Sequence, residues 1–283
     1  MKRFILTLFI ITMALTSSPE LLSQGGSNPL MPQTQRTTFL IGPVFGYNRS
    51  LHSASIPSFQ GNNEVNCPVF ANGSQNGYYV GGSFEYLLGG AVNSTSSIII
   101  KAVYNTLPSF FEEGGDDLQT RVIEEATGAE NIITTSIMHN YEVDYSLISL
   151  EGLYKLNLGN SGFGIVAGPT FDFAIARTRT QTLDLIEPSD IYFAQNDDLT
   201  DEYPNARYSD DLRSIIFDDG DIEGSSAFRL GLKVGAQYEI DQVLNKAIIV
   251  PHIFYNFGIT NLSADLEWRV SAVQIGFDIR WAM

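Results

Sequence analysis

Apolar and polar side chains alternate along most of the chain after residue 37. Because successive side chains of a β-strand point to opposite faces, this period of two predicts strands with one apolar and one polar face. The last segment is the clearest case, with Ile275, Phe277 and Trp281 on one face against Asp278 and Arg280 on the other. We expect eight strands, at 38–48, 77–88, 97–107, 140–158, 162–180, 226–240, 247–260 and 266–282, and a short helix within 117–130.

The connections between these segments alternate in length along most of the chain. The short ones are 89–96, 159–161, 241–246 and 261–265, and the long ones are 49–76, 108–139 and 181–225. Short periplasmic turns, long extracellular loops and an even strand count are typical of outer-membrane β-barrels. The ten steps from Ser271 to Trp281, tilted by roughly 40°, rise about 25 Å, which matches the apolar band of such barrels. We therefore expect an all-β fold, an eight-stranded antiparallel up-and-down transmembrane barrel; a soluble β-sandwich is the alternative.

The polar faces of the expected strands carry charges of both signs in equal number. Five acids and five bases fall there: Glu85, Glu151, Asp172, Glu239 and Asp278, with Lys101, Lys155, Arg229, Lys233 and Arg280. Charges removed from water are costly unless they are paired. An eight-stranded barrel is just wide enough for its side chains to fill it. We expect a lumen charge network in a filled barrel, with a small pore as the less favoured reading.

Composition restricts the partners and the location. The chain has 283 residues and 16 Lys+Arg against 32 Asp+Glu, a net charge of −16, which excludes nucleic acid as a partner. Lys2 and Arg3 precede a short apolar run at 4–15, which predicts a signal peptide over residues 1–23. A periplasmic lead-in at 24–37 and the barrel at 38–283 follow. No later apolar run reaches 18 residues, so the pattern excludes a helical membrane protein.

Four stretches carry a resemblance to a known family. They are IGPVFGYN (41–48), YYVGGSFEYLLG (78–89), GIVAGPTFDF (164–173) and the terminal VQIGFDIRWAM. Residues 38–283 resemble the outer-membrane β-barrel domain family of Gram-negative bacteria, often called PorT-like. The resemblance implies an integral outer-membrane protein surrounded by lipid and lipopolysaccharide. It also implies insertion by the barrel-assembly machinery, because the apolar parity ending at Met283 is similar to the signal which that machinery recognises. It implies little about activity.

One local cluster has the residue types of a hydrolase. His139 lies near Ser136 and either Glu142 or Asp144, and a nucleophile, a base and an acid could act on lipid or peptide at the outer rim. Such trios also arise by chance in Ser-rich strands. We therefore expect no enzyme, no catalytic residue and no cofactor, and keep a barrel-embedded hydrolase near His139 as the alternative.

The long connections concentrate acidic residues. Residues 181–225 contain 13 acids: Asp184, Glu187, Asp190, Asp197, Asp198, Asp201, Glu202, Asp210, Asp211, Asp218, Asp219, Asp221 and Glu223. Residues 108–139 add Glu112, Glu113, Asp116, Asp117, Glu124, Glu125 and Glu130. Packed carboxylates repel, and a Ca²⁺ or Mg²⁺ ion at Asp218, Asp219, Asp221 and Glu223 would relieve that repulsion; a solvated acidic surface is the simpler interpretation. The preferred function is structural or partner-binding through these loops, with a place in an envelope or secretion assembly left open.

Overall fold

A computed structural model describes residues 39–57, 69–88, 94–159, 161–195, 199, 203–244 and 247–283. The chain divides into two units, Met1–Thr34 and Gln35–Met283, and the described residues all belong to the second. The expected signal peptide (1–23), the lead-in (24–37) and Cys67 lie outside the described residues. Across the described ranges, no helix is long and apolar enough to cross a membrane.

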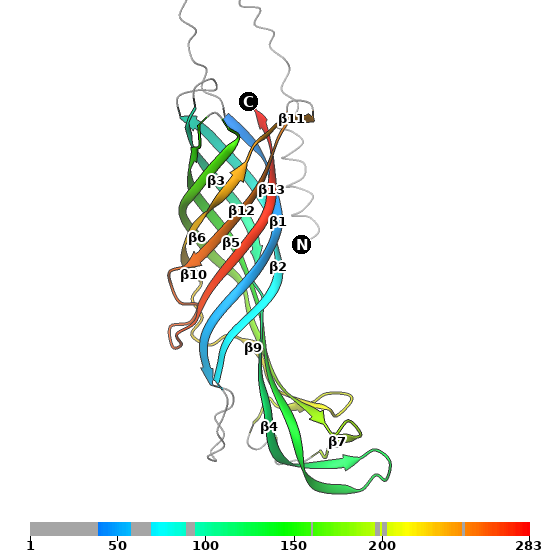
Figure 1. The fold of residues 1–283 in the computed structure, drawn as a ribbon. Helices are drawn as coiled ribbons and strands as arrows, with labels where there is room; N and C mark the ends of the chain where they lie inside the picture. The colour runs from blue at the N-terminus through cyan, green and yellow to red at the C-terminus, as the bar shows by residue number, and fades with distance from the viewer. Residues whose placement is uncertain are drawn as a thin grey trace, which may run out of the picture. The chain divides into compact units, whose positions relative to one another are not determined.

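The described chain folds into one sheet of thirteen strands, in which every pairing is antiparallel (Figure 1). The strands are β1 (Phe39–Pro57), β2 (Val69–Leu88), β3 (Ser96–Thr106), β4 (Ser109–Glu124), β5 (Glu130–Asn157), β6 (Phe163–Glu187), β7 (Ile191–Phe193), β8 (Arg207–Tyr208), β9 (Ser214–Asp221), β10 (Phe228–Tyr238), β11 (Ile240–Leu244), β12 (Ala247–Gly258) and β13 (Arg269–Ala282). The expectation of an all-β, antiparallel protein is confirmed.

Part of the sheet closes on itself. Among the described strands, eight follow one another in the order β1, β2, β3, β5, β6, β10, β12 and β13, and β13 pairs back to β1. Closure depends on β5, which pairs with β3 through Ser146–Leu156 and with β6 along most of its length. We call this closed part the ring. One of its ends carries the C-terminus and the β5–β6 turn (the turn end), and the long connections leave from the other.

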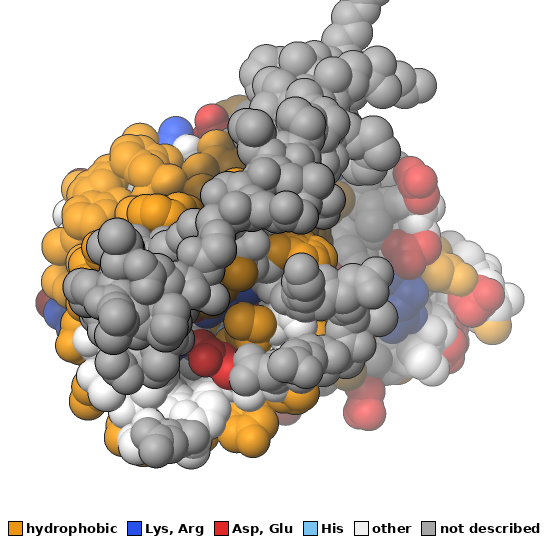
Figure 2. Space-filling view, turned by 90° about the horizontal axis from the view of Figure 1, so that it is seen from above, with side chains coloured by type: hydrophobic (Ala, Val, Ile, Leu, Met, Phe, Trp, Pro, Cys, Tyr) orange, Lys and Arg blue, Asp and Glu red, His pale blue; other side chains and the backbone are white. Residues whose placement is uncertain are grey.

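The two faces of each ring strand differ in exposure as the period of two predicts. On β13, Ile275 and Phe277 are 52% and 40% exposed, whereas Gln274 and Asp278 are at most 1% exposed. Hydrophobic side chains cover the outer side of the ring in Figure 2. The ring therefore has an apolar outside, and its interior combines charged and polar side chains with small apolar clusters, such as that of Ile99, Leu153, Val166 and Phe254.

The interior changes character at the end away from the turns. There an apolar cluster lies at the end of the ring and just beyond it, made by Ile56, Phe70, Leu107, Phe111, Tyr141, Val143, Tyr145, Leu147, Ile222, Leu262, Trp268, Val270 and Ala272. Several of its aromatic side chains contact one another edge to face, including Phe111 with Trp268 and Phe111 with Tyr141. Packing of this kind closes the ring's interior at that end.

The long connections contain far more strand than expected. The helix expected within 117–130 is wrong, because β4 occupies Ser109–Glu124 and pairs with β5. Only Leu107 and Pro108 separate β3 from β4, and Pro108 has no N–H to continue the ladder. The chain therefore changes neighbours there without ending the sheet. Similarly, β1 continues to Pro57 and β2 begins at Val69, inside the connection expected at 49–76.

These additional strands form a second region of the sheet, which we call the extension. It contains β4, the parts of β5 and β6 beyond the ring, β7, β8 and β9, and Figure 1 draws it at the opposite end from the C-terminus. One face is closed by an apolar cluster that includes Val122, Ile137, Leu185, Phe193 and Ile215. The acidic residues expected on long loops are therefore carried largely by β-strands.

Candidate functional site

Ten charged side chains from the inner faces of the ring strands meet in its interior. All ten residues singled out by the sequence lie there, and each has a partner of opposite charge within 4.0 Å. The pairs are Glu85–Lys155, Glu85–Arg280, Lys101–Asp278, Glu151–Lys233, Lys155–Glu239, Asp172–Arg229 and Asp278–Arg280. Glu239, at the turn end, is the most exposed, with 20% of its side chain accessible.

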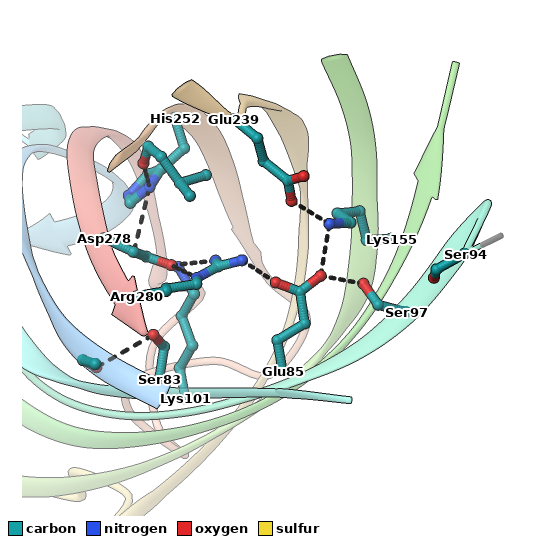
Figure 3. A network of polar contacts seen from close by, with 12 residues as sticks. Ser83, Glu85, Ser94, Ser97, Lys101, Lys155, Glu239, His252, Asp278 and Arg280 are labelled. Atoms are coloured by element: carbon teal, nitrogen blue, oxygen red, sulfur yellow. Dashed lines mark hydrogen bonds and ion pairs between the residues drawn. The ribbon is translucent and has the colours of Figure 1, made fainter. Parts of the chain in front are cut away.

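The largest network lies nearest the turn end (Figure 3). Arg280 bridges Glu85 and Asp278, and its Nε donates to Asp278 Oδ2 at 3.0 Å. Lys155 lies between Glu85 and Glu239, and the Ser97 hydroxyl also donates to Glu85. Every oxygen of the Glu85 carboxylate is therefore matched by a donor, as a buried carboxylate requires.

A second pair of contacts lies deeper in the ring. Lys233 pairs with Glu151, and Arg229 Nε lies 3.0 Å from Asp172 Oδ2. The Phe254 side chain contacts two cations, with the Lys101 and Lys233 ammonium nitrogens 5.2 Å and 5.6 Å from the centroid of its aromatic ring. This geometry is that of cation–π contacts, which separate and stabilise two like charges.

Three interior residues that take part in these contacts were not among the charged positions selected from the sequence. Tyr79 and His252 are joined by a hydrogen bond of 2.6 Å between the hydroxyl and Nε2, and Phe254 contacts the lysines. The period-two parity of 247–260 places His252 and Phe254 on one inward face, so this signal was available for both. Tyr79 carries no comparable signal, because its neighbour Tyr78 is equally aromatic and faces outward.

The arrangement links distant strands across the interior of the ring. Lys101 on β3 reaches Asp278 on β13, and Glu85 on β2 contacts both Arg280 on β13 and Lys155 on β5. The side chains of these five residues are at most 2% accessible to solvent. Opposite charges that are held in place and shielded from water brace the ring across its interior.

The expected hydrolase residues do not converge. His139 shares the buried face of β5 with Tyr141 and is 7% exposed, whereas Glu142 and Asp144 are exposed on the opposite face. Ser136 also falls on the face opposite to His139, because three positions separate them along a strand of period two. Ser136, Glu142 and Asp144 therefore do not share a face of β5 with His139.

The four acids proposed for a metal ion are divided between the two faces of the extension. Asp218 pairs with Arg179 and Asp219 with Arg207, while Glu223 lies 3.6 Å from Arg179. Asp221 is exposed. No group of three or more His, Cys, Asp or Glu in the described ranges is placed to hold a metal ion. Asp197, Asp198, Asp201 and Glu202 lie outside the described residues.

The apolar cluster beyond the charges contains its own polar contacts. Trp268 Nε1 donates to His52 Nδ1 at 3.1 Å, so His52 carries its proton on Nε2 and donates it to the Leu107 carbonyl at 3.0 Å. Tyr141, on the part of β5 beyond the ring, is 2% exposed, and burial raises the pKa of its hydroxyl to about 12. These contacts fix large side chains at the ring's outer end.

Comparisons with known proteins find a solved structure of low similarity. No family model matches the chain, and no curated protein matches it. Among solved structures, it is similar to Ail, the attachment invasion locus protein of Yersinia pestis, solved in complex with the heparin analogue sucrose octasulfate. The two are 10% identical, the match covers 86% of this chain and 99% of Ail, and the TM-score is 0.31.

Proposed function

We propose that the protein is a non-enzymatic integral outer-membrane β-barrel, of the PorT-like kind, which binds an envelope partner through its extension. The eight ring strands would span the membrane, with the turn end in the periplasm and the extension outside the cell. One observation carries the proposal: the ring is apolar outside and holds paired charges inside. A soluble protein would have the opposite distribution, since it exposes its charges and buries its large apolar side chains.

The outer belt of the ring supports the membrane assignment. Along the ring strands, large apolar side chains that are 40% exposed or more recur at outward-facing positions, including Ile100, Leu150, Ile165, Leu232 and Ile253. Soluble monomers rarely expose contiguous apolar patches larger than a few hundred Å². Aromatic side chains mark both ends of the belt: Tyr154, Phe163, Tyr238 and Trp281 at the turn end, and Tyr47, Phe173 and Phe257 at the other.

The extension supports partner binding. Its exposed acids outnumber its bases, and its arginines are already engaged: Arg121 with Glu130, Arg179 with Asp218 and Arg207 with Asp219. An acidic surface carried on an ordered sheet suits a partner with a basic face, and complementary charge would accelerate their encounter. The partner itself is defined only by this charge.

The membrane proposal is tested by the behaviour of the full chain in its native envelope. We expect it in the outer-membrane fraction, resistant to extraction by carbonate, and migrating differently on gels before and after boiling, because closed barrels resist unfolding by detergent at room temperature. Recovery of a folded, water-soluble protein from the periplasm would refute the assignment.

Partner binding is tested by a deletion that follows the strand pairing. Leu185 N–H donates to the Arg213 carbonyl, and Asp184 pairs with Ser214, so residues 188–212 can be replaced by a short turn between β6 and β9. We expect this variant to insert normally and to lose proteins that co-purify with the wild type. A matched variant that neutralises Asp210, Asp211, Asp221 and Glu223 should weaken the same interaction and its salt dependence. Unchanged co-purification in both variants would exclude the extension as the binding surface.

A further inference from the structure

The outer face of the ring changes from apolar to polar just beyond Tyr47 on β1. From there most outward positions of β1, β2 and β13 carry guanidinium, hydroxyl or amide groups, with Leu51 and Val273 as apolar exceptions. The polar ones are Arg49, Ser53, Asn72, Ser74, Asn76, Arg269 and Ser271. No acid occurs among them. We propose that this patch binds the phosphorylated headgroup of a glycolipid of the surrounding outer leaflet, an inference that rests on the membrane orientation proposed above.

The patch contains a groove. It has a volume of about 410 Å³ and is lined by residues of four neighbouring strands, among them Leu51, Ser53, Ser74, Tyr255, Phe257 and Arg269. Tyr255 and Phe257 belong to the apolar belt, and the polar groups lie at its edge. The lining combines apolar side chains with Arg269, and Arg49 lies two positions from Leu51 on the same face of β1, outside the lining. This combination fits a ligand with acyl chains and an anionic head.

Arg49 is positioned without being neutralised. Its Nη1 donates to Asn76 Oδ1 at 2.7 Å and its Nη2 to Ser74 Oγ at 2.6 Å. Both acceptors are neutral, and they lie on the adjacent strand β2, so they orient the guanidinium across the outer face. A guanidinium has five N–H donors, which leaves three for a phosphate.

Arg269 supplies the second positive charge. It is exposed and forms no ion pair within 4.0 Å in the described part of the chain. Glu267, two positions earlier on the same side of the chain, lines a neighbouring cavity with Arg269, Ser53 and Asn261 without reaching it. The strand register sets Ser53 opposite Arg269 and Arg49 opposite Val273. The two arginines are therefore four positions apart along the strands, roughly 13 Å, which one lipid headgroup can span.

Four arginines of the extension differ from Arg49 and Arg269. Arg121, Arg179 and Arg207 each pair with a carboxylate, and Arg213 donates to three backbone carbonyls. Charge left without a carboxylate at the edge of an apolar belt is complementary to the phosphates that lie at that depth of a membrane. The neighbouring hydroxyl and amide groups suit sugar hydroxyls, which favours a glycolipid over a free anion.

The test compares lipids that differ only in phosphate. The full chain is placed in phosphatidylcholine nanodiscs containing either phosphorylated or dephosphorylated lipid A, and the lipid A retained is measured by native mass spectrometry. We expect wild-type protein to retain the phosphorylated form about tenfold more, and R49Q/R269Q to lose that preference. R49K/R269K should keep part of it. R121Q/R207Q, which removes the same charge from the extension, should behave as wild type.

Each other result is decisive. Equal retention of the two lipids by the wild type would by itself overturn the proposal. So would an unchanged lipid preference in R49Q/R269Q, provided that the variant is folded, as shown by a change in gel migration on boiling. Displacement of lipid A by millimolar inorganic phosphate would identify a free-anion site instead. Failure of wild type to insert into nanodiscs would refute the barrel assignment itself, which keeps the two failures apart.

Discussion

At the scale of single residues, the interior charges are stable only as pairs. Lys233 and Glu151 are 3% and 1% exposed in their side chains, so neither can be solvated if its partner is lost. Removal of one member of a buried pair costs about 3–5 kcal/mol, whereas replacement of both by apolar groups of similar size is often neutral. The network is therefore expected to act mainly by disfavouring alternative strand arrangements in which a buried charge would lack its partner.

Replacing Lys233 with Met should destabilise the protein by about 3–5 kcal/mol, because the Glu151 carboxylate would remain buried without its cation. The double variant Lys233→Met/Glu151→Met should recover most of that loss. Guanidinium unfolding in detergent micelles measures both. Arg121→Met is the control: its pair with Glu130 is more than half exposed, so a change below about 1 kcal/mol is expected. Equal losses in the single and double variants would contradict the pairing argument.

Tyr141 predicts an alkaline limit to stability. It lies beyond the ring, and burial raises the pKa of its hydroxyl to about 12, whereas in the unfolded chain tyrosine titrates near 10. Between these values the unfolded state loses the proton and the folded state keeps it. Stability should therefore fall as pH rises from about 10 to about 12, by roughly 1.4 kcal/mol per unit from this residue, and then level off.

Tyr141→Phe keeps the aromatic side chain but removes its hydroxyl, so it should remove that contribution to the pH dependence of stability. Unfolding followed between pH 9 and 12 would show a slope smaller by one proton than in wild type. An identical slope in the two proteins would mean that the hydroxyl ionises in the folded state as readily as in the unfolded chain.

Parity along a strand predicts which side chains share a face, but it does not predict which of them meet. Lys101 and Asp278 are 177 positions apart, and the tilt and stagger of the ring bring them to 3.0 Å. Similarly, Glu85 has two lysine or arginine partners from different strands. Such pairings depend on strand order and register around the whole ring, which no local pattern contains.

At the scale of elements, close approach between strands fixes where glycine is needed. Gly46 on β1 faces Gly276 on β13, and the Tyr79 side chain covers both from inside. A Cβ atom added at Gly276 would lie 2.3 Å from the Phe45 carbonyl oxygen and 2.3 Å from the Tyr79 hydroxyl. The hydroxyl also bonds to His252, so it cannot move away without a further loss.

Gly276→Ala should therefore destabilise the protein by about 1–3 kcal/mol, as overpacking of a filled interior does. Gly152→Ala, on the outer side of β5, should have little effect, since no atom lies within 4 Å of the added methyl group. The two variants are compared by the temperature at which the folded band disappears on unboiled gels. A similar shift in both would show that strand flexibility, and not contact, decides the outcome.

The ring strands could be located from alternation alone, because one face of each is mainly apolar. The extension could not, because its strands carry mixed faces. On β4, Glu112 and Glu113 neighbour Phe110 and Phe111, and the bulge between Gly114 and Asp116 breaks the period. Its pairing with β5 follows from the continuation of the β3–β5 ladder past Pro108, a tertiary effect that overrides weak local preference.

At the scale of the whole molecule, charge is segregated. Five acids and five bases balance within the ring, and the surplus of negative charge lies on the extension. Balanced charges cross-linking the strands would block ion flow, and the apolar cluster around Trp268 adds a second barrier at the other end. Both barriers are built from side chains that also stabilise the fold, so neither can open without cost.

The full chain in planar bilayers should therefore give no steady conductance steps at neutral pH, under conditions in which a general porin conducts. The physical reason is that Arg280, Lys155 and Glu85 leave no solvent-accessible path: their side chains are at most 1% exposed. Truncation of the outer barrier by Trp268→Ala should not create steps, because the charge network still closes the turn end. Reproducible steps from wild-type protein, purified to a single folded band, would mean that the interior opens in a membrane and that a pore is the better description.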